Sequence, residues 1–318
     1  MSDTPESLLE AVRFYSDLDR CEAKMARMKW ENGEPVCPKC GGTHIGRIAS
    51  RRMYQCKDKD CRKQFSVKVG TIFEDSPLGL DKWFVAVWCI ANAKNGISSH
   101  ELGRALDITQ KSAWFMLHRI REAMRSESFE KMDGEVEADE TFVGGRAANM
   151  HKHKREKRVA GRGPGEHMTA VQGILQRGGP VRPIVVTKTD GATLQGNVRR
   201  HVDLRAAVYT DSATAYDGLS RVFLHKTVDH LVSYVSGRVH TNGLENFWCL
   251  LKRSIKGTYT HVAGFHLQRY CDEQAWRYIH RKTNDGSRFD RLLETVVGRR
   301  LTYRVLCAID DAGFMGIK

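Results

Sequence analysis

The spacing of hydrophobic residues predicts helices in the first part of the chain. Leu8 and Val12 begin an apolar series at helical intervals, so residues 5 to about 30 are expected to form one or two short helices. Thr4 followed by Pro5 predicts the helix start, because threonine caps helices well and proline suits the first helical position. These helices carry no candidate chemistry, and we interpret them as packing support.

Three further helices are expected before the middle of the chain. The apolar run from Leu80 to Ala91 has helical spacing and predicts a buried core helix, too short to span a membrane. Residues 98–106 and 111–125 predict two helices joined by the turn 107–110. This is the plan of a helix-turn-helix motif, whose second helix can enter the major groove, although any two-helix corner looks similar. The residues at its reading end are Gln110, Lys111, Ser112 and Trp114.

The next part of the chain has patterns typical of β-strands. In the segment 134–145, strand formers stand among charged residues, which predicts a strand that presents Asp139 or Glu140 from its middle. Residues 168–175 and 181–186 flank a Gly-Gly-Pro turn and predict a hairpin. Together these segments predict three antiparallel strands in sequence.

Helices and strands alternate after this hairpin. Residues 241–253 have a helical pattern in which Glu245 and Lys252, two turns apart, share a face. The other expected elements are a helix at 193–202, a strand ending at Asp211, a helix at 216–222, a strand at 226–229, and closing helices at 264–281 and 288–297.

Composition and charge favour a cytosolic protein with a polyanionic partner. The chain has 318 residues, enough for two or three domains, and a formal net charge of +13, which favours nucleic acid over membrane. No apolar stretch approaches the ~20 residues of a transmembrane helix, and the N-terminus lacks a signal-peptide core. The nine cysteines are odd in number and unevenly spaced, which argues against a disulfide framework.

Four of the cysteines have the spacing of a zinc ribbon. Two short cysteine turns, each leading into strands, can hold one structural Zn²⁺ through four thiolates. His44 is a possible substitute ligand, but ribbon geometry favours cysteine at all four positions. The predicted zinc ligands are Cys37, Cys40, Cys56 and Cys61. Basic residues that could contact phosphates accompany them, namely Arg47, Arg51, Arg52, Lys57, Lys59, Arg62 and Lys63.

A basic, glycine-rich loop is expected after the strand that contains Asp139. The segment from Arg146 to Arg162 is rich in lysine and arginine, and glycines and a proline follow it. Beside a nucleic-acid enzyme's active site, such a loop is expected to contact phosphates, although a solvated loop without a role is the alternative. Its candidate DNA-binding residues are Lys152, Lys154, Arg155, Lys157 and Arg158.

Asp139, Asp211 and Glu245 are candidate ligands of hard divalent cations, with Glu140 as an alternative to Asp139. Such ions bind converging carboxylates, and phosphoryl transfer commonly uses a pair of them. Strand alternation places Glu137 on the same face as Asp139 and places Glu140 on the other face.

These three acids, with Lys252 two turns after Glu245, resemble the catalytic set of the DDE transposases, which have an RNase H-like fold. The separation of Asp211 and Glu245 is close to the spacing in that family. The segments Ala-Asp-Glu-Thr-Phe-Val-Gly-Gly, Tyr-Thr-Asp-Ser and Leu-Leu-Lys-Arg-Ser-Ile-Lys-Gly-Thr-Tyr resemble a bacterial insertion-sequence group that carries an N-terminal zinc ribbon and is related to Merlin elements. The resemblance extends from about Trp30 to about Arg281.

The resemblance implies a role for each of these residues. Asp139, Asp211 and Glu245 would bind two Mg²⁺ (or Mn²⁺) ions, and Lys252 would contact phosphate. Some relatives have asparagine in place of the glutamate, so Asn242 and Asn246 remain alternatives to Glu245. On the same helix, Trp248 and Arg253 are candidate DNA contacts, with core packing as the alternative for Trp248.

The expected fold is a multidomain α+β protein that comprises a zinc ribbon, a helix-turn-helix and an RNase H-like α/β catalytic domain. The implied function is a DNA transposase that cleaves and transfers strands at the terminal inverted repeats of an insertion sequence, acting on double-stranded DNA as a homodimer in the cytoplasm, at the nucleoid. The alternatives are a structure-specific nuclease and a non-catalytic DNA-binding regulator. The expected boundaries are 1–30 for the N-terminal helices, 31–76 for the ribbon, 77–130 for the helix-turn-helix region, 131–285 for the catalytic domain and 286–318 for a helical tail.

Overall fold

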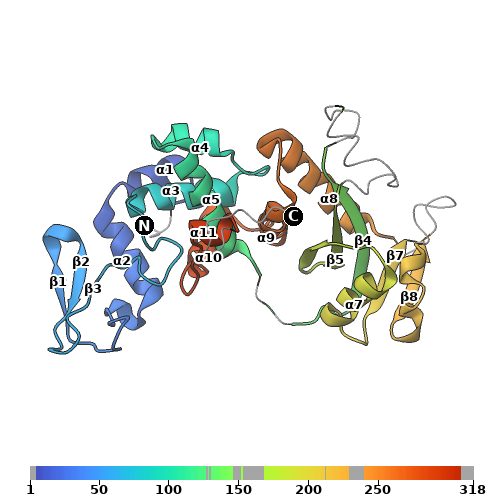
Figure 1. The fold of residues 1–318 in the computed structure, drawn as a ribbon, viewed down its shortest axis with the longest axis horizontal. Helices are drawn as coiled ribbons and strands as arrows, with labels where there is room; N and C mark the ends of the chain where they lie inside the picture. The colour runs from blue at the N-terminus through green and yellow to red at the C-terminus, as the bar shows by residue number, and fades with distance from the viewer. Residues whose placement is uncertain are drawn as a thin grey trace. The chain divides into compact units, whose positions relative to one another are not determined.

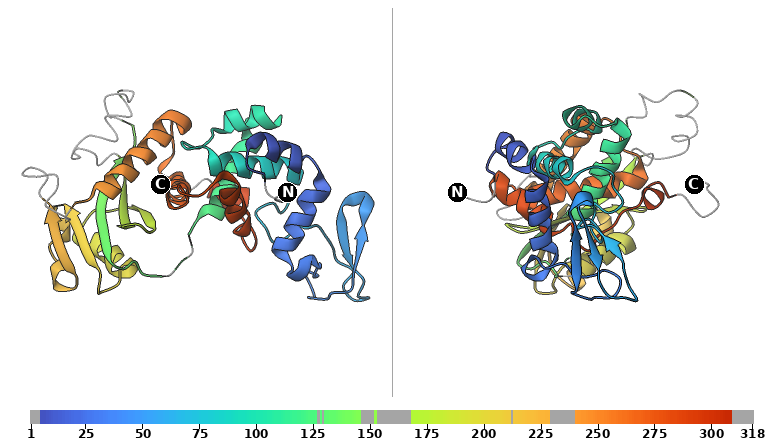
Figure 2. Two further views of the ribbon diagram at one scale, coloured as in Figure 1. Left: turned by 180° about the vertical axis from the view of Figure 1, so that it is seen from behind. Right: turned by 90° about the vertical axis from the view of Figure 1, so that its left-hand side faces the viewer.

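The computed structural model describes residues 5–126, 128, 130–145, 152, 168–211, 213–228 and 240–308. The described residues form two compact units (Figures 1 and 2). The first contains the residues up to Met124 together with those from Lys282 onward, and the second extends from Arg125 to Arg281. The segment from residue 286, expected from the sequence to be a tail, thus lies in the first unit.

The first unit is built around an aromatic helical core. The Phe289 ring lies 5.1 Å from Tyr15, 5.8 Å from Phe84 and 5.4 Å from Trp88, measured between ring centroids. Since Phe289 is wholly buried, the helix that carries it belongs to this core. The helices are α1 Leu8–Tyr15, α2 Leu18–Lys29, α3 Leu80–Asn92, α4 Ser99–Leu106, α5 Gln110–Met124, α10 Asp285–Glu294 and α11 Tyr303–Leu306.

The start of α1 differs from the sequence prediction. Ser7 caps the helix by accepting a hydrogen bond from the Glu10 backbone N–H at 3.3 Å. The expectation that Pro5 opens the helix is therefore wrong, and Thr4 lies outside the described residues. The physical reason is that the Ser7 hydroxyl satisfies a backbone donor of the first turn, while the Glu10 side chain accepts the Glu6 backbone N–H just before the helix.

Helices α4 and α5 confirm the predicted two-helix corner. Ser98 and Glu101 form a complete capping box at the start of α4. Asp107 ends this helix in the left-handed conformation, and the chain enters α5 at Gln110. The turn is tight because Gly103 has no side chain, since a Cβ there would lie 3.1 Å from the Ile108 carbonyl oxygen. The first residues of α5 are exposed.

The zinc-ribbon segment forms a small antiparallel sheet in the first unit. Its strands are β1 Ile45–Ile48, β2 Met53–Cys56 and β3 Gln64–Phe65, in the order β1-β2-β3. The short turns η1 Glu31–Gly33 and η2 Ala49–Arg51 lie before β1 and between β1 and β2. The first cysteine turn precedes β1, and the second connects β2 to β3, so each leads into a strand as the sequence predicts.

The second unit contains a five-stranded mixed sheet in the order β6-β5-β4-β7-β8 (Figure 1). The predicted hairpin is confirmed, and β4, β5 and β6 are antiparallel neighbours. Strands β7 and β8 continue the sheet in parallel beside β4. The strands are β4 Glu135–Val143, β5 Thr169–Gln176, β6 Val181–Val186, β7 Ala207–Asp211 and β8 Leu224–Val228.

Helices pack on both faces of this sheet. Leu194 and Val198 of α7 join one buried cluster with Val136 and Ala138 of β4. On the other face, α8 and α9 form a second cluster that includes Val143 of β4. The helical elements are α7 Gly191–His201, α8 Asn242–Ser254, the π-helix η6 Ile255–Tyr259, the 3-10 turn η7 Gly264–His266 and α9 Leu267–Ile279. None of the helices in the described ranges is long and apolar enough to cross a membrane.

Two predicted elements of the second unit differ in the structure. The expected helix at 216–222 consists of two 3-10 turns, η4 Thr214–Tyr216 and η5 Leu219–Arg221, separated by Gly218, a residue with low helix propensity. Strand β8 begins two residues before the predicted Lys226, because Leu224 and His225 pair with β7. The strands and the other helices of this unit follow one another in the order expected from the sequence.

The close approach of α8 to the sheet depends on Gly173 of β5. A Cβ at this position would lie 2.6 Å from side-chain atoms of both Leu244 and Trp248. Gly173→Ala should therefore destabilise the second unit by about 1–3 kcal/mol through overpacking, as measured by denaturant unfolding.

Gly196→Ala is the matched control for this substitution. Gly196 lies within α7, is exposed, and has open space where its Cβ would lie. Alanine there should stabilise the protein by about 0.5–1 kcal/mol, because it favours the helix more than glycine. Equal effects of the two substitutions would contradict the assigned close contact.

Candidate functional site

Asp139 and Asp211 lie on adjacent parallel strands at the same level. Strands β4 and β7 pair from Glu135↔Ala207 to Glu137↔Tyr209. Asp139 and Asp211 each stand two residues beyond the last of these pairs. Because side chains alternate between the faces of a sheet, both carboxylates lie on the face that carries Glu137. The two predicted strand positions are therefore brought together by the sheet.

Helix α8 brings the third candidate acid to this face. Glu245, Trp248 and Lys252 follow one another at intervals of three and four residues and form one stripe along the helix. The Trp248 indole Nε1 donates a hydrogen bond of 2.8 Å to Oδ2 of Asp139. Glu245 is exposed and Lys252 is half-buried. The stripe therefore borders Asp139.

The contact of Trp248 with Asp139 was not foreseen from the sequence. Trp248 is only 5% exposed, and its ring packs among the apolar residues between α8 and the sheet. Of the two roles that the sequence left open, burial favours packing over base stacking. The spacing that places Trp248 between Glu245 and Lys252 was the available signal.

The electrostatics of Asp139 fit a cation-binding role. The pKa of Asp139 is raised to about 6, mainly by burial. The negative charges of Asp211 and Glu245 contribute to this rise, and the Trp248 hydrogen bond opposes it. A bound divalent cation would relieve both penalties, because it favours the ionised form. Asp139 thus interacts electrostatically with both of the other candidate acids.

Their oxygens are more widely spaced than the sulfurs of the ribbon. In the described ranges, the four ribbon cysteines are the one set of three or more potential metal-binding side chains with all ligand atoms within 4.8 Å of one another. The carboxylate group is therefore more open, and Asn242 and Asn246, both exposed in the first turns of α8, remain beside it as alternatives to Glu245.

Glu140 has a different environment from Asp139. The Tyr216 hydroxyl donates a hydrogen bond to Glu140, and Gln172 donates to the Tyr216 oxygen at 3.3 Å. Burial raises the pKa of Glu140 to about 8, with further contributions from the charges of Asp139 and Asp211. Because Tyr216 belongs to the cluster on the α7 face, Glu140 points away from Trp248. The environments of Asp139 and Glu140 therefore differ, whereas the strand pattern alone offered both as candidates for the acid presented from the middle of the strand.

The four ribbon cysteines have the geometry of a structural zinc site. The sulfur atoms of Cys37 and Cys61 lie 3.6 Å apart, as do those of Cys40 and Cys56. A tetrahedral Zn²⁺ with bonds of about 2.3 Å requires sulfur–sulfur distances of about 3.8 Å. The donor set is therefore complete with cysteine alone, without His44. The structure thus brings together the four cysteines that the sequence predicts as zinc ligands.

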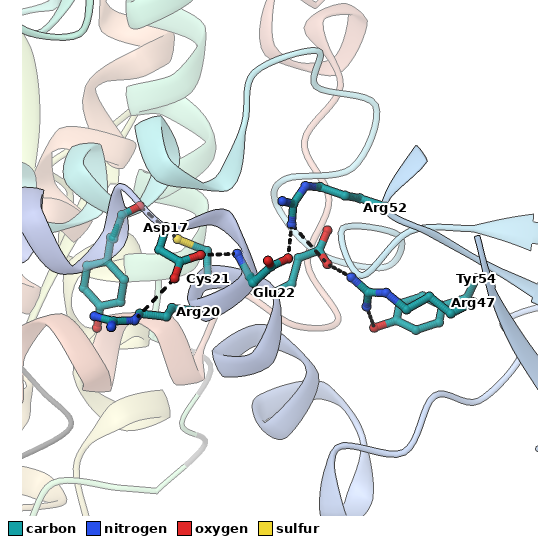
Figure 3. A network of polar contacts seen from close by, with 9 residues as sticks. Asp17, Arg20, Cys21, Glu22, Arg47, Arg52 and Tyr54 are labelled. Atoms are coloured by element: carbon teal, nitrogen blue, oxygen red, sulfur yellow. Dashed lines mark hydrogen bonds and ion pairs between the residues drawn. The ribbon is translucent and has the colours of Figure 1, made fainter. Parts of the chain in front are cut away.

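The ribbon is joined to α2 through the buried carboxylate of Glu22. Arg47 donates to Glu22 at 2.7 Å, and Arg52 lies 3.8 Å from the same oxygen and also pairs with Asp19 (Figure 3). Arg47 also donates a hydrogen bond to the Tyr54 hydroxyl at 3.2 Å. These two arginines, expected to contact phosphates, thus also hold the ribbon sheet on the helix.

The predicted reading end of α5 is partly engaged within the protein. Gln110 donates to the Ser99 hydroxyl at 2.8 Å, and Ser112 contacts the Thr109 hydroxyl at 2.9 Å. Lys111 lies over the Tyr303 ring at 5.6 Å. Trp114 is half-buried, whereas Gln110, Lys111 and Ser112 remain exposed.

The other predicted DNA contacts are only partly described. Arg253 and Lys152 are exposed. Lys154, Arg155, Lys157 and Arg158 lie outside the described residues.

We expect one zinc ion per chain, bound by the four ribbon cysteines. Elemental analysis of freshly purified, reduced protein should find it, and Cys37→Ser should lower its occupancy and unfold the ribbon locally, since small metal domains fold around their ion. Cys249→Ser is the matched control, because this cysteine is exposed and lies on α8. A zinc-free wild-type protein would refute the assignment.

Comparison with known proteins agrees with this geometry. Residues 131–278 match the family described as the ISXO2-like transposase domain, and residues 17–64 match the transposase zinc-ribbon domain. An uncharacterized protein in the transposable element ISH50 of Halobacterium salinarum is 30% identical over 257 residues, which is 76% of this chain and 84% of that protein. An uncharacterized transposase-like protein of Haemophilus influenzae is 30% identical over 99 residues, which is 31% of this chain and 80% of that protein.

The matched domains include both sets of candidate residues. The transposase domain contains the mixed sheet and α8, and the zinc-ribbon match contains all four ribbon cysteines. The similarity to the ISH50 protein extends over most of both sequences. The chain therefore belongs to the ISXO2-like transposases.

Proposed function

We propose that this transposase binds the terminal inverted repeats of its element and catalyses Mg²⁺-dependent DNA cleavage and strand transfer. The observation that carries the proposal is the electrostatic interaction of Asp139 with both Asp211 and Glu245 on one face of the sheet. A buried carboxyl group whose pKa is raised by burial and by neighbouring carboxylates is typical of active sites. Family membership supports the same reaction class.

The three acids would bind Mg²⁺ or Mn²⁺, and the neighbouring residues would orient the acids. Two such ions supply a nucleophile from water or from a DNA 3′-hydroxyl and stabilise the charge that develops on the phosphate. The Trp248 N–H donates to Oδ2 of Asp139 and would orient this carboxylate toward a cation. Lys252, on the same stripe, would contact a phosphate oxygen of the DNA.

Double-stranded DNA is the proposed partner of both units. The exposed start of α5 would contact base edges in the major groove of the terminal repeat. Arg253 and the basic loop would contact the backbone, which agrees with the net charge of +13. A homodimer in the cytoplasm, at the nucleoid, would join the two ends of the element.

Removing any of the three acids should abolish cleavage and leave DNA-end binding largely intact. Asp139→Ala, Asp211→Ala and Glu245→Ala each remove a proposed metal ligand, whereas none of these residues is a proposed DNA anchor. The measurement is cleavage and strand transfer of the native element ends in Mg²⁺, with end binding measured in parallel.

Asp217→Ala serves as the control, because Asp217 is an exposed acid near Asp211 in the sequence. It should retain full activity. An active Glu245→Ala protein together with an inactive Asn242→Ala protein would move the third ligand to Asn242. Strand transfer by Asp139→Ala or Asp211→Ala would refute the metal site.

The basic loop and helix α5 should contribute differently to DNA binding. Five residues of the loop are neutralised in the test variant: Lys152, Lys154, Arg155, Lys157 and Arg158. The variant should bind specific and random DNA more weakly by similar factors. The slope of log affinity against log salt concentration should become shallower by about 0.9 per lost phosphate contact. Gln110→Ala or Lys111→Ala should instead reduce the difference in binding affinity between specific and random DNA.

A salt titration with the terminal repeat and a scrambled duplex measures both effects. If the loop variant loses discrimination while the α5 variants keep it, the two roles are reversed.

A further inference from the structure

Glu137 is a buried acid that the proposed reaction does not use. It lies two residues before Asp139 on the same face of β4, and it is only 1% exposed. Both of its carboxylate oxygens are bonded. Oε1 accepts a hydrogen bond of 2.9 Å from Arg177 Nε, and Oε2 accepts one of 3.0 Å from the backbone N–H of Leu244.

The second bond joins β4 directly to the first turn of α8. Leu244 immediately precedes Glu245, and its N–H is one of the unpaired donors at the helix start. An N-cap side chain usually satisfies such a donor, but Thr241, at the N-cap position of α8, makes no such bond. The Glu137 carboxylate of β4 accepts this N–H instead. Its negative charge also interacts favourably with the positive end of the helix dipole.

The surrounding contacts fix this junction from two further sides. Arg177, which holds Oε1 of Glu137, also donates a hydrogen bond of 2.8 Å to the His240 carbonyl just before α8. A Cβ at Gly243 would lie 2.8 Å from Oε2 of Glu137, so there is no space for a side chain there. The start of α8 is therefore packed directly against the Glu137 carboxylate.

We propose that Glu137 is a positioning residue that sets the place of Glu245 relative to Asp139. It does so by fastening the first turn of α8 to the strand that carries Asp139. Trp248 makes the second connection, one turn further along the helix, by its bond to Asp139. This inference rests on the proposed function, because it assumes that Asp139 and Glu245 bind the same metal centre.

The test measures Mn²⁺ affinity of the zinc-loaded, full-length protein by electron paramagnetic resonance, together with cleavage of the element ends. Glu137→Gln keeps the size of the side chain but replaces one carboxylate oxygen by an NH₂ group. Because this group cannot accept a hydrogen bond, the bond from Arg177 or the bond from Leu244 is lost. We expect Mn²⁺ affinity to fall by about 10- to 100-fold, as for other residues that orient metal ligands. Saturating Mn²⁺ should restore cleavage in this variant but not in Asp139→Ala.

Glu135→Gln is the matched control. Glu135 lies two residues earlier on the same face of β4, and its Oε1 lies 3.6 Å from Arg177 and accepts the Tyr209 hydroxyl at 3.0 Å. The Glu135→Gln substitution therefore also removes a negative charge beside Arg177, but it leaves the bond from Leu244 to Glu137 unchanged. The Mn²⁺ affinity of Glu135→Gln should stay within about twofold of the wild-type value. This change is much smaller than the loss of at least about 10-fold expected for a residue that orients metal ligands.

A second variant covers the case in which Glu137→Gln fails to fold. Gly243→Ala keeps every carboxylate and displaces the junction, so it should also weaken Mn²⁺ binding. Wild-type affinity in either folded variant, or an equal loss in Glu135→Gln, overturns the positioning role. The proposed metal site itself fails in a different way, when Asp139→Ala binds Mn²⁺ as tightly as the wild-type protein.

Discussion

The direct packing of α8 on the central strands is the constraint on which the candidate catalytic centre depends. Gly173 of β5 pairs with Asp139 of β4, and its missing side chain leaves the space that Trp248 and Leu244 fill. A helix held at this distance can place both an indole N–H and a carboxylate beside Asp139. Because interiors are close-packed, a small displacement of the helix would change the spacing of the acids. The site is thus a property of the sheet–helix interface as a whole.

The two proposed metal centres illustrate two ways of holding cations. In the ribbon, four sulfurs lie close together on short turns, and Zn²⁺ would complete a local fold. At the sheet, the acids come from β4, β7 and α8, which are far apart in the sequence and are brought together by the packing of the core. Their mutual repulsion is already present in the raised pKa of Asp139. The second centre thus depends on the packing of the whole unit, and the first on a short local segment.

Local patterns in the sequence were sufficient to predict the strands of Asp139 and Asp211, the helix of Glu245 and the ribbon cysteines, because strand alternation, helical spacing and cysteine turns are short-range signals. The bond from Trp248 to Asp139 and the buried state of Glu137 were beyond such signals. Both depend on the orientation of α8 on the sheet. This orientation results from packing contacts among many residues that are distant in the sequence. The false helix at 216–222 had apolar residues at suitable spacing, but Gly218 interrupts it.

The order of the chain through the two units has a consequence for biosynthesis. Residues 125–281 form one unit, while the segments before and after them fold together as the other. Phe289 of α10 fills the aromatic core around Tyr15 and Phe84, and Ile72 donates a backbone hydrogen bond to Val296. A ribosome therefore completes the sheet unit before it releases the last core residues of the helical unit. Prematurely terminated chains would lack Phe289 and therefore could not complete the aromatic core that supports α1 and α3.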